Sequence, residues 1–99
     1  MEQHAVVLDV SRYRAAAGKR DEMLAEMKKI ADSASKADGC FGAQVCVSSS
    51  DNESLIAVSR WKSREALEKF SGEMLSAASR DKLTHLLAGR AQHEHLTPV

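Results

Sequence analysis

The stretch Leu55–Phe70, LIAVSRWKSREALEKF, decides the fold of this chain because its periodicity changes once along its length. It opens with four apolar residues, Leu55–Val58, two of them β-branched, which is typical of a strand. The only tryptophan, Trp61, comes next, and Ser63 is a good N-cap for a helix. Beyond Ser63, apolar residues recur at three- and four-residue spacing as far as Phe70, which indicates a helix. The stretch therefore predicts a strand that turns at a tryptophan into a capped helix, a corner where small α/β domains often keep a ligand cleft.

Length and composition exclude several classes of protein. Ninety-nine residues make a single domain, 1–99, which can bury roughly two-thirds of the unfolded chain's surface. The 14 Lys and Arg balance the 14 Asp and Glu, and no block of like charge disturbs this balance. Nucleic acid and anionic membranes both need a basic surface, so neither is expected as a partner. The N-terminus lacks the pattern of a signal peptide and no apolar run could span a bilayer, so we expect a cytoplasmic protein.

The chain before the central stretch predicts two strands and a helix. The strands run from about His4 to Tyr13 and from about Ala43 to Ser48, and the helix from about Lys19 to Lys36. The segment DGCFG, Asp38–Gly42, ends the helix, since its glycines permit the positive φ angles of a tight reversal. The polar segment Ser48–Ser54 has the composition and length of a hairpin turn into the central strand.

The chain after the central stretch predicts one more helix and one more strand. Ser71-Gly72 is expected to end the helix of the central stretch. A new helix then runs from about Glu73 to Ala88, with Gly89 as its stop. The last strand, from about Arg90 to Thr97, is polar. The residues expected to point inward from this helix are Leu75, Ala78, Leu83, Leu86 and Leu87.

The element order, strand-helix-strand-strand-helix-strand, predicts an α+β fold, the ferredoxin-like plait. In this fold a four-stranded antiparallel sheet carries both helices on one face, and the other face lacks a cover in a monomer. The residues on that open face form one of two alternating sets from the first strand, either Val6, Leu8 and Val10 or Ala5, Val7 and Asp9. An exposed apolar sheet face requires a partner, and a second copy is the simplest one. We therefore expect a homodimer with its two sheets packed face to face.

The two cysteines and one acid of the first strand are residue types that can carry chemistry. Cys40 and Cys46 could form a disulfide, a metal pair or two unrelated thiols; their spacing is not that of a redox or zinc motif, which favours unrelated reduced thiols. Asp9 interrupts an apolar strand, so it is either a functional carboxylate or an acid near a strand end or on a wet sheet face.

The sequence resembles the antibiotic biosynthesis monooxygenase (ABM) family. The resemblance rests on W-x-S-x-E-A-L from Trp61 to Leu67, on G-C-F-G from Gly39 to Gly42 and on the element order, and it covers nearly the whole chain. It implies a dimeric α/β barrel and, for many members, a cofactor-independent oxygenase that acts on quinol- or anthrone-like aromatic substrates. Other members degrade haem or convert small signalling molecules, and the usual proline before the glycine is Asp38 here.

Haem degradation does not fit these residues. The haem-degrading relatives have an asparagine in the first strand, a second tryptophan nine residues after the first, and a haem-ligating histidine nine residues further on. The matching positions here are closest to Asp9, then Phe70 and Ser79, and a serine cannot replace the imidazole that holds ferric haem. His85 lies six residues further, roughly 240° around a helix, so it does not substitute for that ligand.

Oxygenation without a cofactor requires an apolar slot, an aromatic wall and one base, because the substrate itself supplies the electrons. The candidate base is Asp9, and a carboxylate among apolar neighbours has the raised pKa that suits a base near neutral pH. Trp61 and Phe70 are the candidate wall, with Tyr13 or Ser79 as assisting pocket residues. For both aromatic rings the competing interpretation is plain core packing.

Two alternatives remain open from the sequence. The first concerns metal: His93 and His95 share one strand face, and His4 could approach them, but nothing supplies a second shell, so no metal or other cofactor is expected. The second concerns function: the chain is either an ABM-type monooxygenase that uses O2 and a small aromatic, or a non-catalytic dimeric protein that binds a small apolar ligand.

Overall fold

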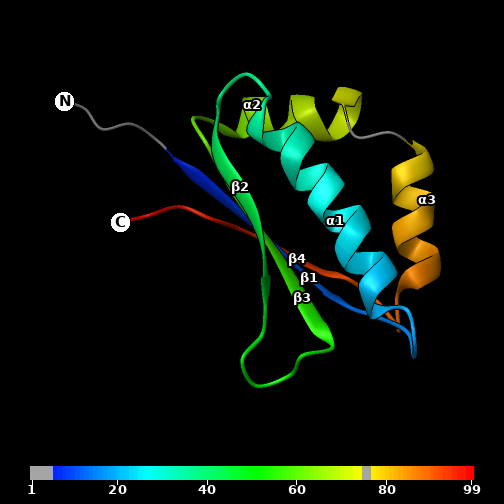
Figure 1. The fold of residues 1–99 in the computed structure, drawn as a ribbon. Helices are drawn as coiled ribbons and strands as arrows, with labels where there is room; N and C mark the ends of the chain where they lie inside the picture. Colours follow the sequence, from blue (N-terminus) through cyan, green and yellow to red (C-terminus); the bar gives the residue numbers. More distant parts are fainter. Residues whose placement is uncertain (1–5, 75–76) are drawn as a thin grey trace.

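The elements predicted from the sequence are present in the predicted order. A computed structural model describes residues 6–74 and 77–99 of the chain (Figure 1). The strands and helices are β1 (Val7–Arg14), α1 (Arg20–Ser35), β2 (Cys40–Val47), β3 (Ser54–Trp61), α2 (Arg64–Lys69), the π-helical turn η1 (Phe70–Met74), α3 (Ala77–Leu86) and β4 (Gln92–Leu96). Among the described residues no helix combines the length and apolar character needed to cross a membrane.

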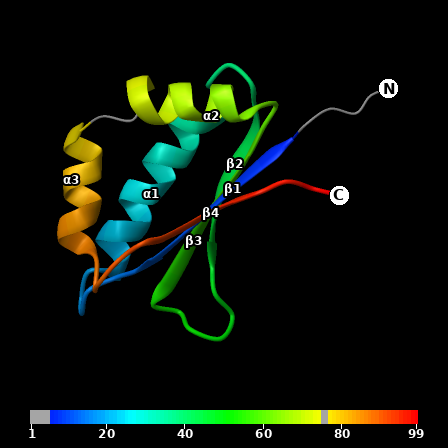
Figure 2. The ribbon, with the colours of Figure 1, turned by 180° about the vertical axis from the view of Figure 1, so that it is seen from behind.

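The four strands form one antiparallel sheet in the order β2-β3-β1-β4. Strand β1 lies between β3 and β4, so that Asp9 pairs with Ser59 on one side and with His95 on the other. The front and back views show α1, α2 and α3 on the same side of this sheet (Figures 1 and 2). This is the predicted ferredoxin-like α+β plait.

The hydrophobic core lies between the sheet and the helices. Its first part lies beneath α1 and α3 and consists of Ala15, Met23, Met27, Leu55, Leu83 and Leu86. Its second part lies beneath α2 and the C-terminal end of α1 and consists of Val7, Ala34, Trp61, Leu67 and Phe70. Leu55 and Trp61, at the two ends of β3, are both fully buried, so the strand that opens the central stretch anchors both parts.

The alternation along β1 decides which residues occupy the open sheet face. Val7 and Ser11 are buried toward the helices, so Leu8 and Val10 point to the opposite face. The strand register adds further apolar residues to that face, namely Ile56, Val58 and Leu96. The first of the two predicted sets is therefore the one on the open face.

The predicted helix break at Ser71-Gly72 was wrong. The chain continues from α2 directly into η1, and the next helix begins at Ala77 rather than Glu73. A single glycine costs a helix interior only about 1 kcal/mol relative to alanine, which the burial of Phe70 against Trp61 can offset. Leu75, one of the predicted inward residues, lies outside the described residues.

Most of the other residues predicted to point inward from this helix are buried, but one is exposed. Leu83 and Leu86 are buried and Leu87 is partly buried, as predicted, but Ala78 is exposed. Ala78 lies five residues before Leu83, about 140° around the helix axis, and therefore points away from the core.

Strand β2 begins earlier than the predicted Ala43. Cys40 already pairs with Trp61, and the register shifts between Cys40 and Gly42, which is a β-bulge or a related irregularity. Cys40 and Cys46 are both free thiols, so they do not form the disulfide that was one of the alternatives.

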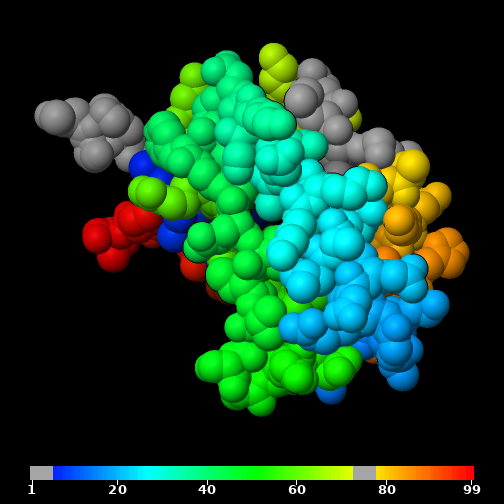
Figure 3. Space-filling view, viewed as in Figure 1, coloured from blue at the N-terminus to red at the C-terminus, as the bar shows by residue number. Residues whose placement is uncertain are grey.

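The turn between β2 and β3 is held against the end of β1 and the start of α1. Asp51 forms an ion pair with Arg14 at the end of β1, and Arg20 Nε donates a hydrogen bond of 2.6 Å to the carbonyl oxygen of Asn52. In the space-filling view this turn projects beyond the body of the molecule, while α1 lies across the middle (Figure 3).

A buried carboxylate connects α3 to α1. Glu26 on α1 is only 2% exposed, and its Oε1 lies 3.3 Å from Lys82 Nζ on α3 and 3.5 Å from Lys29 Nζ. Burial opposes ionisation of Glu26, but hydrogen bonds from Ser79 and Lys82 and the charges of both lysines lower its pKa below the usual range. Glu26 therefore stays ionised and fixes α3 over the core.

Two local devices hold the strand-helix corner of the central stretch. Ser63 is the N-cap of α2, and its Oγ accepts a hydrogen bond of 3.1 Å from the backbone N–H of Ala66. The backbone N–H of Lys62 donates to the carbonyl oxygen of Gly39 at 2.8 Å, which joins this corner to the reversal before β2. Gly39 has φ +86°, and a Cβ atom on it would lie 2.8 Å from the Cβ of Ala66.

We predict that Gly39→Ala destabilises the fold by roughly 1–3 kcal/mol, because alanine would add both backbone strain and a contact with Ala66. Gly18→Ala is the matched control: Gly18 also has a positive φ, +75°, but open space surrounds the added methyl group. Urea unfolding of the two variants measures the difference. Equal losses of stability in the two variants would show that close packing at Gly39 contributes nothing.

Candidate functional site

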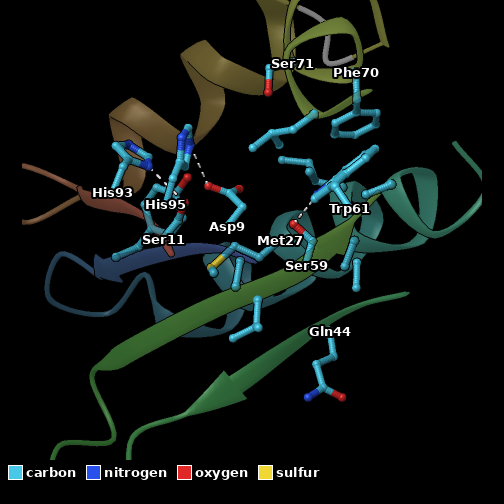
Figure 4. Close-up of a pocket in the computed structure, with 18 of the residues that line it drawn as sticks. Asp9, Ser11, Met27, Gln44, Ser59, Trp61, Phe70, Ser71, His93 and His95 are labelled. Carbon is cyan, nitrogen blue, oxygen red and sulfur yellow. Dashed lines mark hydrogen bonds and ion pairs between the residues drawn. The ribbon is translucent and has the colours of Figure 1, made fainter. Parts of the chain in front are cut away.

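A cavity of about 260 Å³ lies between the helix-bearing face of the sheet and the helices (Figure 4). Strands β1 and β4 supply polar side chains at one end, while α1, α2 and the end of β3 supply mainly apolar ones at the other. The polar lining residues include Asp9, Ser11, Tyr13, His93 and His95. The apolar lining residues include Met27, Ile30, Ala34, Trp61, Leu67 and Phe70.

A carboxylate and an imidazole form a pair at the polar end. Asp9 on β1 and His95 on β4 are register partners, and His95 Nε2 lies 3.2 Å from Asp9 Oδ1 (Figure 4). Burial raises the pKa of Asp9 above the ordinary value of 3.8, although the charges of His95 and His93 and the hydrogen bond from His95 act in the opposite direction. Asp9 is therefore a stronger base than an exposed aspartate.

A second polar pair lies two residues along the same strands, on the same face of the sheet. Ser11, which is 6% exposed, lies with its Oγ 2.9 Å from His93 Nδ1. The ring of Tyr13 meets the ring of His93 edge-on, with centroids 5.8 Å apart and planes at 80°. Burial raises the pKa of Tyr13, while a side-chain hydrogen bond with Ser11 acts in the opposite direction. Tyr13 therefore keeps its proton at neutral pH.

Two aromatic rings stand at the other end of the cavity. The centroids of Trp61 and Phe70 lie 5.4 Å apart with their planes tilted by 36°, within the range of favourable aromatic pairs. Trp61 is completely buried, and its indole N–H donates a hydrogen bond of 2.8 Å to Ser59 Oγ (Figure 4). The indole therefore both packs in the core and contributes to the lining of the cavity.

The structure brings four of the five residues selected from the sequence to this cavity: Asp9, Tyr13, Trp61 and Phe70. Ser79 is not among the lining residues, and on α3 it hydrogen-bonds to Glu26 instead.

The grouping of Ser11, His93 and His95 with Asp9 was not predicted from the sequence. The signal that could have found them is the strand pairing: alternate residues of two adjacent antiparallel strands share one face. Of the three histidines that could approach one another as metal ligands, His4 lies outside the described residues. Within the described ranges, no group of three or more His, Cys, Asp or Glu residues is arranged to hold a metal ion.

The comparison of this sequence with protein families identifies one family. The sequence model of the family described as antibiotic biosynthesis monooxygenase, ABM, matches residues 7–82. The chain therefore belongs to the ABM family, and the resemblance found in its motifs is confirmed. A search of curated proteins finds no match to the chain.

Solved structures with the same fold come from several bacteria. Rv0793 from Mycobacterium tuberculosis has a TM-score of 0.86 at 21% identity, with 95% of each chain covered. PA3566 from Pseudomonas aeruginosa has a TM-score of 0.83 at 17% identity, with coverage of 100% of this chain and 99% of that one. A variant of SnoaB from Streptomyces nogalater, a cofactor-independent oxygenase, has a TM-score of 0.81 at 15% identity, with 94% and 92% covered. At these identities the likeness concerns the fold.

The raised pKa of Asp9 predicts how stability depends on pH. A carboxyl whose folded pKa exceeds its unfolded pKa contributes stability that is fully present below the unfolded value and is lost as pH rises through the folded value. The free energy of unfolding of the wild type should therefore rise relative to that of Asp9→Asn as pH falls from neutral toward 3.8. Urea unfolding of both proteins at matched pH measures this difference. A wild type that instead loses stability relative to Asp9→Asn on acidification would contradict the raised pKa.

Proposed function

We propose that this ABM-family protein is a cofactor-independent monooxygenase that oxidises a small, electron-rich aromatic substrate, quinol- or anthrone-like, with O2. The observation that carries the proposal is the Asp9–His95 pair at one end of a cavity whose other end is apolar. Membership of the ABM family and a fold shared with a cofactor-independent oxygenase, SnoaB, support the same reaction class.

The volume and lining of the cavity favour a small aromatic substrate. About 260 Å³ lies just below the roughly 300–1,000 Å³ typical of ligand pockets. Trp61 and Phe70 provide a rigid apolar end, and Ala34 and Leu67 add aliphatic contacts there. A flat ring held among these side chains would place its oxygen substituent at the polar end, close to Asp9.

The proposed reaction begins with a proton transfer. Asp9 removes a proton from the substrate, and His95 stabilises the carboxylate in its reactive geometry. The resulting anion is rich enough in electrons to reduce O2. For an anthrone the overall change converts a CH2 group and O2 into a carbonyl group and water, so the four electrons that O2 accepts all come from the substrate. The reaction therefore needs no external reductant.

The test is O2 consumption with a panel of hydroquinones and anthrones. Asp9→Asn should lower kcat/KM by about a hundredfold or more, because it removes the base and keeps the shape of the side chain. Asp38→Asn, which changes an exposed acid outside the cavity, should leave the rate unchanged.

Two results would contradict the proposed reaction. One is a rate that survives in Asp9→Asn. The other is tight binding of these compounds without any use of O2, which would instead favour a non-catalytic ligand-binding protein.

We also propose that the protein functions as a homodimer through the open face of its sheet. Leu8, Val10, Ile56 and Val58 give that face an apolar centre, and none of the helices in the described ranges covers it. A second copy that presents the same face would bury the apolar residues of both copies at once, as in any two-fold symmetric interface. Pairing of this kind would complete the dimeric α/β barrel expected from the family resemblance.

Val10→Lys should convert the dimer into a monomer, because it places a charge at the centre of the proposed interface. Ala25→Lys adds the same charge at an exposed position of α1 and should leave the oligomeric state unchanged. Light scattering coupled to size-exclusion chromatography measures the mass of each. A wild type that elutes as a monomer at all accessible concentrations would overturn the proposed dimer.

A further inference from the structure

Three side chains outside the Asp9–His95 pair form a continuous polar row at the same end of the cavity. Ser11 occupies its middle: its Oγ lies 2.9 Å from His93 Nδ1. The ring of Tyr13 meets the same imidazole with centroids 5.8 Å apart, and a side-chain hydrogen bond with Ser11 acts to lower the pKa of Tyr13. Ser11 and His93 are register partners, and Tyr13 follows Ser11 on the same face of β1. Figure 4 shows Ser11 and His93 beside Asp9 and His95, with each imidazole directed to its own partner.

The row joins the buried cavity to solvent. Ser11 is 6% exposed, whereas His93 is an exposed residue on the edge strand β4. A hydroxyl group both donates and accepts, so Ser11 can receive a proton from one neighbour while it passes its own to the other. Such an arrangement can move a proton between Tyr13 and the imidazole of His93 without opening the cavity.

We propose that Tyr13, Ser11 and His93 form a proton relay that delivers the second proton of the oxygenation, to the peroxide formed when O2 adds to the substrate. This inference rests on the proposed function and adds a general acid to it. Asp9 and His95 take the first proton, and the relay supplies the other one from a separate set of groups.

The step balances in protons and electrons. The substrate anion passes one electron to O2, and the resulting radical and superoxide combine, so that a C–O bond forms and the distal oxygen carries the negative charge. Tyr13 gives its hydroxyl proton to that oxygen, Ser11 restores the proton of Tyr13, and His93 restores that of Ser11. Solvent then returns a proton to the exposed imidazole. Loss of the remaining C–H proton to a base breaks the O–O bond, forms the carbonyl group and releases hydroxide, which becomes water.

The arrangement of titratable groups supports this division of roles. The titratable residues among those that line the cavity are Asp9 and Tyr13 from β1 and His93 and His95 from β4. Burial raises the pKa of Asp9, which strengthens a base, and it raises the pKa of Tyr13, which keeps the phenol protonated. Base and acid thus stand on the same face of β1 with opposite protonation states at neutral pH.

The test compares the amount of O2 consumed with the amounts of oxygenated product and of H2O2 that result. Dithranol, a dihydroxyanthrone, serves as substrate for the full-length protein, and three quantities are measured: O2 consumed, quinone formed and H2O2 released. Without the relay, the unprotonated peroxide breaks its C–O bond and returns to the substrate radical and superoxide. Two superoxide ions and two protons then give H2O2 and O2, and two substrate radicals couple to a dimer. Ser11→Ala and Tyr13→Phe should therefore raise the H2O2 released per O2 consumed by roughly tenfold or more, because general acid catalysis contributes about a hundredfold or more.

Matched variants distinguish the relay from a packing effect. Ser11→Thr keeps the hydroxyl group and should restore low release of H2O2. His85→Gln changes an imidazole on α3 that contacts the backbone of its own helix, and it should behave as the wild type. Nitrogen NMR of the histidine rings gives a second measurement, because loss of the Ser11 hydroxyl should shift the tautomer balance of His93 while Ser11→Thr preserves it.

The outcomes separate the relay from the proposed function. Loss of O2 consumption and of quinone in equal proportion in Ser11→Ala, with no additional H2O2, would overturn the relay and leave the oxygenase intact. A wild type that consumes no O2 with dithranol or the rest of the panel would overturn the proposed function together with the peroxide step. In that case, a His93 tautomer that does not respond to Ser11→Ala would also overturn the coupling of the three side chains.

Discussion

The antiparallel register between β1 and β4 is the constraint on which the site depends. It places His95 opposite Asp9 and His93 opposite Ser11, so that two polar pairs stand side by side on the helix-bearing face. A slip of one residue would send both histidines to the other face of the sheet. The same register sends Leu8 and Val10 to the open face, so one pairing of strands specifies both the chemistry of the cavity and the apolar surface behind it.

Glu26 and Asp9 differ in how fully neighbouring groups compensate their negative charges. Glu26 is deeply buried, but two lysines and Ser79 compensate its charge, and it connects two helices. Asp9 is less buried and has a single imidazole partner, so its charge is only partly compensated. An incompletely satisfied carboxylate destabilises the fold slightly and is a better base, which is the compromise expected of a functional group. The contrast between these two acids supports the proposal that Asp9 is the base.

Much of the fold could be predicted because it follows from local patterns. The periodicity of Leu55–Phe70, the N-cap at Ser63 and the positive φ of Gly39 are all properties of short segments. The predictions that were wrong concern places where a tertiary contact outweighs a local preference. Gly72 did not end the helix after Phe70, and Ala78 is exposed although an apolar pattern placed it inside.

By itself, the sequence determined the order of the elements, the plait and the family, because these depend on periodicity, caps and turns that each segment carries alone. It also singled out Asp9, since an acid within an apolar strand is unusual in any context. Only the tertiary structure decided that His95 lies beside Asp9 and that Ser79 hydrogen-bonds to Glu26 and does not line the cavity. Contacts between residues more than fifty positions apart depend on strand register and helix packing, and no local pattern in the chain encodes these directly.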